Sequence, residues 1–491
     1  MSRLVIFVLL LTFPALLSAA VLPDTLSGIT KGTTLANHKY VVRDSLFVNA
    51  GDTLQISAGD TLIMASPTGF IQVLGSFICE GTSTKQNLIT VPNSRAANGP
   101  GQWGGIVGDS CKYISVRWTK VLWAGGNDLG GHAYRTFDIA SDYANTTQVY
   151  FVHNTVIGTV DDCIGITGGN AVVDSNVIKW CGAPDGDNIN LKGGVVGEIA
   201  YNVIWSSGGN GIKVNASLSS PRITNVCIHN NTIVAGGWRR IGELGYAILV
   251  DKSARAQIYN NIMGDMYQEL EITTKADTIR TVYDNNLFCY TGDSLKGASR
   301  YFPNDGVTRQ APHDWIDVKT NALFKNYAPD FTNDWTTLDG TNDYRILSTS
   351  VAVGHGFTPP APTPSNYWYN PYFGNTTQLP GASNIGALGI YTSTGVNNFS
   401  QSLPTQFALR QNYPNPFNPT TTIEYSLPQT ADVTLKVFNM LGQEVKTLTN
   451  GVESAGVQSV KFDATNLTSG VYFYRLQAGS FSQVKRMLLL K

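Results

Sequence analysis

Short apolar segments that end in asparagine recur along the middle of the chain. Each places a strand-like run before one asparagine and further, mostly apolar residues after it. The recurring residues are Asn154, Asn176, Asn202, Asn231, Asn261 and Asn286, at spacings of 22, 26, 29, 30 and 25 residues. Between them lie four-residue runs whose second and fourth residues are apolar. Alternation with a period of two is typical of β-strands, so each repeat is predicted to contain at least two.

These repeats predict the coils of a parallel β-helix. One coil cannot bury its apolar face alone, so coils must stack, with strands ~4.8 Å apart. Stacking brings equivalent asparagines together, and their amides can form a hydrogen-bonded ladder inside the stack. Ordinary turns of a β-sandwich would also use asparagine. The recurrence of asparagine at one place in the pattern favours the β-helix.

The flanking segments extend this organisation. Residues 44–106 contain short strands about eight residues apart, punctuated by Gly-Asp and Gly-Thr pairs, and are predicted to be the opening coils. A third region follows the repeats and includes the proline-rich segment 358–364, which favours a surface loop in the polyproline conformation. We therefore predict an all-β chain, with a β-helix over residues 21–395, a linker over 396–408 and a separate domain over 409–491.

Residues 1–20 have the pattern of a secretory signal peptide. Arg3 precedes an apolar stretch, Leu4–Leu17, and the small residues Ser18-Ala19-Ala20 suit a cleavage site. The stretch is too short to span a ~30 Å hydrocarbon core, and no other segment approaches 18 consecutive apolar residues. No membrane span is expected. The six cysteines lie far apart, so we expect buried thiols or one or two disulfides in an oxidising compartment.

Composition narrows the choice of partner. The chain has 34 basic and 35 acidic side chains, and charged residues make up 14% of its 491 positions, against a typical ~25%. Because there is no basic tract, a nucleic-acid partner is not expected. Hydrophobic residues make up 42% of the chain, which is enough for a large core.

The asparagine-bearing coils resemble the right-handed parallel β-helix, or pectin-lyase-like, superfamily. Gly101–Ile106 resembles the end of the opening coils in many secreted members, and the segment from Leu323 to Ala387 is similar to a closing segment. The resemblance covers roughly residues 22–395 and implies the fold. That fold carries lyases, hydrolases, esterases and non-catalytic adhesins, so the resemblance leaves the activity open.

The last 83 residues show about seven short alternating strands separated by turn signals, a pattern that suits a small β-sandwich. Three motifs, Asn412–Pro419, Val433–Phe438 and Ser469–Tyr474, make residues 409–491 resemble the type A C-terminal sorting domain of the type IX secretion system. This resemblance implies Sec export in a Gram-negative bacterium and transfer across the outer membrane by the secretion machinery. It also implies removal of the domain, with release or surface attachment. A carbohydrate-binding sandwich is the alternative.

Alignment of the coils predicts a row of polar residues just before one strand series. If Ile164, Ile189 and Ile212 point inward, Asp162, Asp187 and Asn210 occupy the same place in successive coils. The two carboxylates should then lie about 5 Å apart. Carboxylates that close repel, so one should take up a proton or a cation should bind between them. Ca²⁺ is the candidate cofactor, with Asp162 and Asp187 as its ligands.

Three interpretations of this row remain open. Residues 161–164 (Asp-Asp-Cys-Ile) resemble a stretch of polygalacturonase-type hydrolases, whose paired aspartates act as acid and base, but the Gly-His-Gly and Arg-Ile-Lys motifs are missing. Alternatively, a bound cation could acidify a uronate while a lysine removes its proton, which is lyase chemistry. The third interpretation is that Asp and Asn cap turns.

The resulting functional hypothesis is a secreted protein that acts on an extracellular, acidic polysaccharide as a lyase or glycoside hydrolase. A non-catalytic glycan-binding or adhesive surface protein is the alternative. The predicted catalytic residues are Asp162, Asp187 and Lys213, and the predicted substrate-binding residues are Lys192, Asn190, Asn210, Trp238 and Arg239.

Overall fold

A computed structural model describes the chain from residue 24 to residue 490. Its gaps are residues 31–32, 36–37, 127–134, 142–146, 183–185, 206–207, 217–221, 238–244, 291–314, 320–322, 328–342, 364–367, 369, 374–377, 389, 391–406, 410–411, 413–414, 416, 454–455 and 480.

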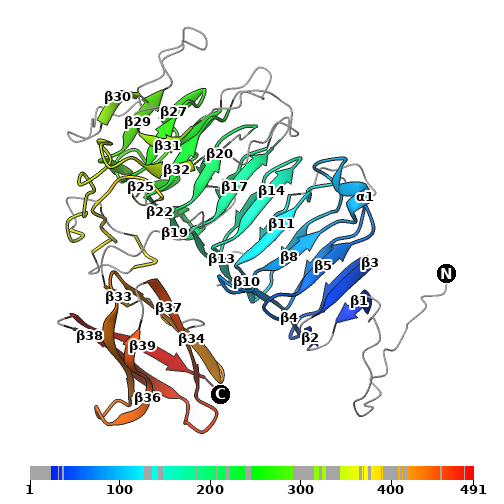
Figure 1. Ribbon diagram of the computed structural model, residues 1–491, viewed down its shortest axis with the longest axis vertical. Helices are drawn as coiled ribbons and strands as arrows, with labels where there is room; N and C mark the ends of the chain where they lie inside the picture. Colours follow the sequence, from blue (N-terminus) through cyan, green and yellow to red (C-terminus); the bar gives the residue numbers. More distant parts are fainter. Residues whose placement is uncertain are drawn as a thin grey trace.

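The described residues from 24 to 319 form a right-handed parallel β-helix with three faces, which confirms the predicted fold (Figure 1). Face 1 is a sheet of ten parallel strands, β2 (Thr33–Leu35), β4 (Thr53–Ile56), β7 (Ser76–Glu80), β10 (Tyr113–Arg117), β13 (Gln148–Val152), β16 (Asn170–Asp174), β19 (Val196–Ala200), β22 (Asn225–His229), β25 (Arg255–Tyr259) and β28 (Val282–Asp284).

The other two faces belong to one sheet of twenty described strands, because the long strand β3 (Lys39–Val48) pairs with strands of both and also with β1 (Asp24–Thr30). Face 2 contains β5 (Thr61–Met64), β8 (Asn87–Thr90), β11 (Thr119–Leu122), β14 (Thr155–Thr159), β17 (Val177–Cys181), β20 (Val203–Trp205), β23 (Thr232–Val234), β26 (Ile262–Gly264), β29 (Leu287–Tyr290) and β30 (Trp315–Lys319). Face 3 contains β6 (Ile71–Val73), β9 (Ile106–Asp109), β12 (Phe137–Ala140), β15 (Ile164–Thr167), β18 (Ile189–Lys192), β21 (Ile212–Asn215), β24 (Tyr246–Asp251) and β27 (Gln268–Ile272). The short helix α1 (Asn93–Ala96) lies between β8 and β9.

The predicted register holds on face 3. Ile164 pairs with Ile189, which pairs in turn with Ile212, and that residue pairs with Ile248. All four side chains have no exposed surface and belong to the core cluster that fills the solenoid. Side chains that alternate with them on the same strands therefore point outward.

The predicted asparagine ladder runs along the corner between face 1 and face 2. Asn202 is typical: its Oδ1 accepts hydrogen bonds from the backbone N–H of Asn176 (3.0 Å) and from the Nδ2 of Asn176 (2.9 Å). The Nδ2 of Asn202 donates to the carbonyl of Val173 (2.8 Å) and to Oδ1 of Asn231 (2.9 Å). The ladder includes all six predicted residues, Asn154, Asn176, Asn202, Asn231, Asn261 and Asn286.

The residue before each ladder asparagine adopts a left-handed backbone conformation. The φ angles of His153, Ser175 and Tyr201 are 58°, 56° and 54°, and the three later coils repeat the pattern. A left-handed conformation costs a residue with a side chain roughly 1–2 kcal/mol, and the buried amide hydrogen bonds of the ladder offset that cost. His153 thus belongs to the turn that precedes Asn154.

The described residues between 323 and 388 cover the outer surface of the last coils. Phe324, Tyr344 and Ile346 pack with Val234 and Ile262, whose side chains point outward from face 2. The strands β31 (Phe324–Asn326) and β32 (Asp343–Ile346) form an antiparallel pair in this cover. A second cluster packs Trp368 and Leu379 against Cys227 and Tyr259 on face 1. The apolar outer surface of these coils is therefore buried.

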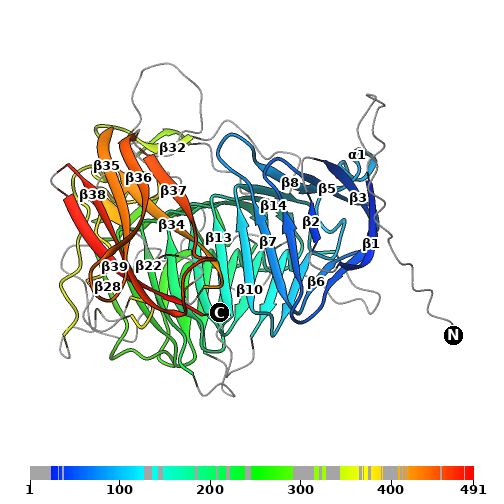
Figure 2. The same ribbon diagram turned by 90° about the horizontal axis from the view of Figure 1, so that it is seen from below.

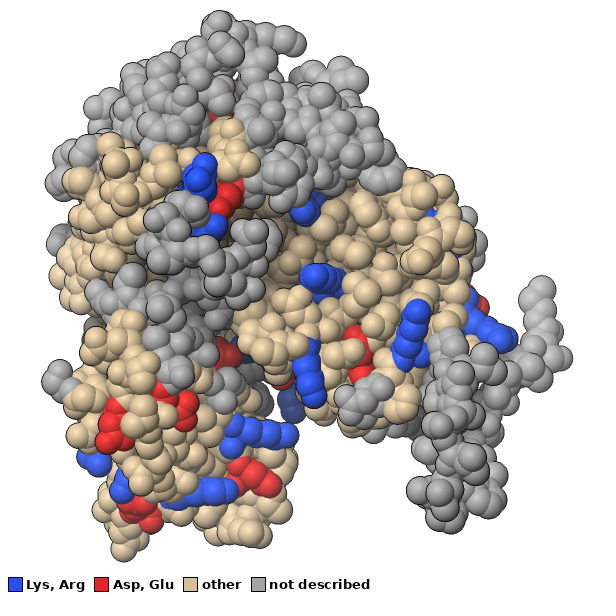
Figure 3. Space-filling view, in the orientation of Figure 1, with Lys and Arg blue, Asp and Glu red and all other residues tan. Residues whose placement is uncertain are grey.

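The C-terminal residues form an antiparallel β-sandwich with its own apolar core (Figure 1). One sheet contains β33 (Ala408–Leu409), β34 (Thr420–Leu427) and β37 (Gly456–Asp463), and the other contains β35 (Ala431–Phe438), β36 (Glu444–Glu453), β38 (Gly470–Ala478) and β39 (Phe481–Leu489). The sandwich lies against face 1 (Figure 2). Arg117 of β10 forms an ion pair there with Glu424 of β34. Figure 3 shows charges of both signs on the sandwich, while the β-helix surface in that view is mostly uncharged.

Candidate functional site

The predicted carboxylates lie in a polar row at the corner between face 2 and face 3. Strand pairing aligns Phe137 with Ile164, Ile164 with Ile189, and Ile189 with Ile212. The residues two positions earlier are therefore stacked in successive coils, and they are Arg135, Asp162, Asp187 and Asn210. Sequence analysis identified the last three members and missed Arg135.

Asp162 is almost completely buried and is bound on both oxygens. Its Oδ1 accepts a hydrogen bond from the backbone N–H of Asp187, at 2.8 Å, in the next coil. Its Oδ2 accepts one from Nδ2 of Asn190, at 2.9 Å, and lies 2.8 Å from Nε of Arg135. Only 4% of the residue is exposed. The carboxylate thus joins three coils rather than facing solvent.

Asp187 repeats this arrangement one coil further along. Its Oδ1 accepts hydrogen bonds from the backbone N–H of Asn210 (2.9 Å) and from Nδ2 of Asn210 (2.6 Å). Its Oδ2 lies 3.3 Å from Nδ2 of Asn190 and 3.5 Å from Nζ of Lys213. Oδ1 of Asn210 then accepts the backbone N–H of Tyr246 at 2.9 Å. The row is therefore a second, short ladder.

Burial and neighbouring charges set the ionisation of the row. Burial raises the pKa of Asp187, the nearby Lys213 lowers it, and the neighbouring Asp162 raises it again, so that the net direction is upward. For Arg135, burial acts to lower the pKa, but the carboxylates of Asp162, Asp138 and Asp161 raise it above its ordinary value. Each buried carboxylate therefore has its own cation.

Lys192 lies on the same face, and nearby carboxylates compensate its charge only in part. It occupies the next outward row, paired with Thr167, and it forms no ion pair with any residue that the structure describes. Burial lowers its pKa and the positive charge of Arg135 lowers it further, while the carboxylates of Asp162 and Asp138 offset part of this effect, so that the net direction is downward. A partly buried ammonium group beside another cation favours a bound anion.

The donor set at Asp162 and Asp187 does not fit Ca²⁺. This ion prefers six to eight oxygen ligands, whereas the carboxylate oxygens here accept N–H groups and contact Arg135 and Lys213. Within the described parts of the chain, no group of three or more His, Cys, Asp or Glu side chains could hold a metal ion. The positive partner that the sequence analysis required is thus supplied by side chains.

Five of the predicted site residues come together here, namely Asp162, Asp187, Asn190, Asn210 and Lys213, with Lys192 in the adjacent row. Trp238 and Arg239 lie outside the described residues. Arg135 carried a usable signal, because it precedes Phe137 by the same two positions by which Asp162 precedes Ile164. Extending the aligned row by one coil would have found it.

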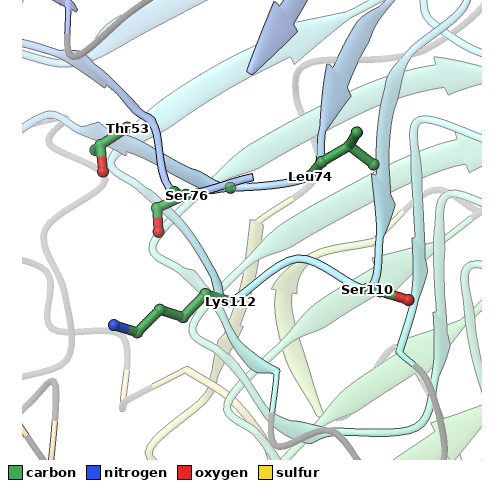
Figure 4. Close-up of a pocket in the computed structure, with 7 residues that line it drawn as sticks. Thr53, Leu74, Ser76, Ser110 and Lys112 are labelled. Atoms are coloured by element: carbon green, nitrogen blue, oxygen red, sulfur yellow. The ribbon is translucent and has the colours of Figure 1, made fainter. Parts of the chain in front are cut away.

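A separate shallow hollow of about 260 Å³ lies at the corner between face 3 and face 1, near the N-terminal end of the β-helix (Figure 4). It is lined by Gly51, Thr53, Leu74, Gly75, Ser76, Ser110 and Lys112. Among these lining residues only Lys112 is ionisable at neutral pH, so the hollow offers hydroxyl groups and one cation. It contains no acid–base pair.

Comparison with known proteins identifies the C-terminal sandwich. A family model described as "Secretion system C-terminal sorting domain" matches residues 411–490. The C-terminal sandwich is a sorting domain. No curated protein and no solved structure matches the chain. The resemblance of the coils to the pectin-lyase-like superfamily therefore rests on the sequence pattern alone.

The sorting domain defines the route and destination of the protein. It directs the chain through the type IX secretion system to the cell surface or the extracellular space, and the secretion machinery is the partner of this domain. The predicted signal peptide, residues 1–20, lies outside the described residues. No helix in the described part of the chain is long and apolar enough to cross a membrane.

Proposed function

We propose that this secreted β-helix protein binds an acidic extracellular polysaccharide along face 3 without cleaving it. The observation that carries the proposal is the bonding of Asp162 and Asp187. Each uses one oxygen to accept a backbone N–H of the next coil and the other to contact Asn190 and a cation. A general acid or base needs a carboxylate oxygen that can reach the substrate. In Asp162 and Asp187 both oxygens already contact groups of the protein.

The cations of face 3 supply the binding chemistry. Lys192 is half-buried, and burial together with Arg135 lowers its pKa. The carboxylate of a uronate residue would neutralise this lysine and form a charge-assisted hydrogen bond with it. Lys213, whose side chain is 26% exposed and pairs with Asp187, lies one coil further along face 3, in the neighbouring row that contains Asn190. A polymer with a carboxylate on each sugar suits a face on which side chains repeat every ~4.8 Å.

Binding assays on the purified secreted protein test this proposal. Polygalacturonate and alginate serve as acidic polymers, and dextran serves as the neutral control. Lys192→Gln should weaken binding to an acidic polymer about tenfold, because a charged hydrogen bond contributes about 1.5 kcal/mol. Lys120→Gln is the matched control, since Lys120 is exposed on face 2 and should leave binding unchanged. Equal retention on dextran, or no effect of Lys192→Gln, would contradict the proposal.

A lyase is the second candidate, and one observation favours it. The lowered pKa of Lys192 increases its neutral fraction, as a base for proton removal from a uronate requires. In this scheme Asp162, Asp187 and Lys213 contribute to catalysis, and Asn190 and Asn210 hold the substrate. Incubation with the same polymers, with unsaturated uronate ends and reducing ends measured separately, distinguishes a lyase from a hydrolase. Product formation that Asp187→Asn abolishes would replace the binding proposal.

A further inference from the structure

Two buried cysteines lie side by side inside the solenoid, next to the carboxylate row. Cys163 directly follows Asp162, and Cys181 is the last residue of β17 in the following coil. Neither residue has exposed surface, and Cys163 belongs with Cys181 to the main core cluster. The two thiols are thus enclosed in the same part of the core.

Strand register places the two cysteines at the same corner of neighbouring coils. The pairing of β14 with β17 sets Cys181 opposite Thr159, and Cys163 lies four residues after Thr159 in the same turn. The thiol of Cys163 interacts with the side chains of Cys181 and Thr159, and Sγ of Cys181 also lies 3.6 Å from the carbonyl oxygen of Lys179. The contact joins neighbouring coils at one corner of the helix, 18 positions apart in the sequence.

The surroundings of other cysteines differ. The thiol of Cys79 contacts the hydroxyl of Thr119 and the amide of Asn87. The thiol of Cys227 contacts the hydroxyl of Tyr259. These two cysteines have partners that cannot form a disulfide, whereas Cys163 has a second thiol as its neighbour.

We propose that Cys163 and Cys181 form a disulfide bond in the exported protein, which clamps together the two coils that carry Asp162 and Asp187. The sorting domain sends the chain out of the cytoplasm, and disulfides form and persist in the oxidising compartments that it crosses. The bond forms while the coils assemble, because both thiols are fully buried afterwards. In the closed coil, burial also holds the pKa of Cys163 well above its ordinary value, so its thiol is a poor nucleophile there.

The oxidant is a disulfide-bearing oxidoreductase of the cell envelope. One cysteine thiolate attacks its disulfide to give a mixed disulfide, and the second thiolate displaces the enzyme sulfur. The new S–S bond forms, two protons leave the pair of thiols, and two electrons reduce the oxidoreductase to its dithiol form. Atoms and electrons balance without any further reactant.

Peptide mapping of the secreted wild-type protein tests the bond directly. The protein is denatured and alkylated without reduction, then digested with trypsin. Lys179 separates the two cysteines, so they fall in different tryptic peptides, 136–179 and 180–192. We expect these peptides to be recovered joined, about 2 Da lighter than their sum, and to separate after reduction. Alkylation of both cysteines, or linkage of either one to a different cysteine, would overturn the proposal.

Variants provide an independent measurement. Cys181→Ser should leave Cys163 as an alkylatable thiol in the denatured protein, and it should remove the effect of a reductant on the unfolding midpoint. Cys227→Ser is the matched control, because it changes a buried cysteine and should leave the reductant effect intact. If the wild-type protein unfolds at the same denaturant concentration with and without reductant, the clamp does not exist.

Discussion

At two corners of the same coils, side chains accept hydrogen bonds from backbone N–H groups of the next coil, but the side chains differ in charge. Between face 1 and face 2, six neutral asparagines continue the ladder from coil to coil. Between face 2 and face 3, Asp162 and Asp187 accept the N–H groups of the next coil, and the row ends where Asn210 accepts the N–H of Tyr246. The first ladder is long and neutral, and the second is short and charged.

The difference follows from what each side chain can offer. An amide both donates and accepts, so one asparagine can bond to the next without limit. A carboxylate only accepts, and its charge must be neutralised when it is buried. Arg135 and Lys213 provide that charge at the second corner. A row of buried carboxylates can therefore extend only over those coils in which a neighbouring cation neutralises the charge.

Placing a charge in the neutral ladder should have the largest effect. Asn202→Asp removes the Nδ2 donor. It places a carboxylate next to two acceptors, the carbonyl of Val173 and Oδ1 of Asn231. The partners of this fully buried position are neutral amide and carbonyl groups, so we expect a loss of about 3–5 kcal/mol of unfolding free energy in urea at pH 7. Asn98→Asp, at an exposed position, is the control. A loss below about 1 kcal/mol would show that the neutral ladder tolerates charge.

Removing a cation from the charged corner should rank second. Arg135→Met leaves Asp162 buried without its partner, and we expect a loss of about 3 kcal/mol. Arg280→Met removes an arginine whose side chain is 52% exposed and pairs with Asp277. Exposed pairs contribute about 1 kcal/mol or less, so this variant should unfold almost like wild type. Equal losses of unfolding free energy in the two variants would contradict the prediction that the buried corner pair contributes more than the exposed pair.

Deleting one amide from the neutral ladder should cost less than charging it. Asn202→Ala leaves the buried carbonyl of Val173 and the N–H of Asn176 without partners, for a loss of about 1–3 kcal/mol. Asn98→Ala is the exposed control. A thermal midpoint for Asn202→Ala that equals that of wild type would contradict the ladder at this coil.

Neutralising the charged corner should have the smallest effect at neutral pH. In Asp187→Asn an amide still accepts the N–H of Asn210, so we expect a change below about 1 kcal/mol. The pKa of Asp187 is raised in the folded state, so the folded protein binds more protons than the unfolded chain just above the ordinary aspartate pKa. The contribution of Asp187 to the free energy of unfolding of the wild type therefore falls as pH rises from about 4. Asp187→Asn should lack this pH-dependent contribution.

Urea unfolding of both proteins between pH 4 and pH 7 measures this difference. Identical pH dependence in the two proteins would contradict the raised pKa. Added calcium should leave the melting temperature of the wild type unchanged, because Arg135 and Lys213 already neutralise the row.

The sequence predicted the first corner almost completely and the second only in part. Asparagine recurs at one place in every repeat, so its ladder could be read from spacing alone. The charged corner combines residue types, and Arg135 replaces the acidic residue of the later coils, which hid it from a search for carboxylate pairs. The hydrogen bonds from backbone N–H groups to Asp162 and Asp187 depend on which carboxylate oxygen points toward the next coil. Spacing in a sequence cannot supply that information.

The outer cover also lay beyond what periodicity could predict. The segment around Tyr344 and Ile385 has little regular alternation, and it packs on side chains that face outward from face 2. Its apolar residues pack on apolar side chains of coils that lie much earlier in the sequence. A closing segment was predicted, and only the three-dimensional pairing defines which face it covers.

The most direct test of the charged corner is a double-mutant cycle between Arg135 and Asp162, measured by urea unfolding. The cycle compares Arg135→Met in the wild type with the same substitution in an Asp162→Asn background. Since Nε of Arg135 lies 2.8 Å from Oδ2 of Asp162, we expect a coupling free energy of at least about 1.5 kcal/mol. The arginine substitution should then cost much less once residue 162 is neutral. Additive effects, within about 0.5 kcal/mol, would contradict the account.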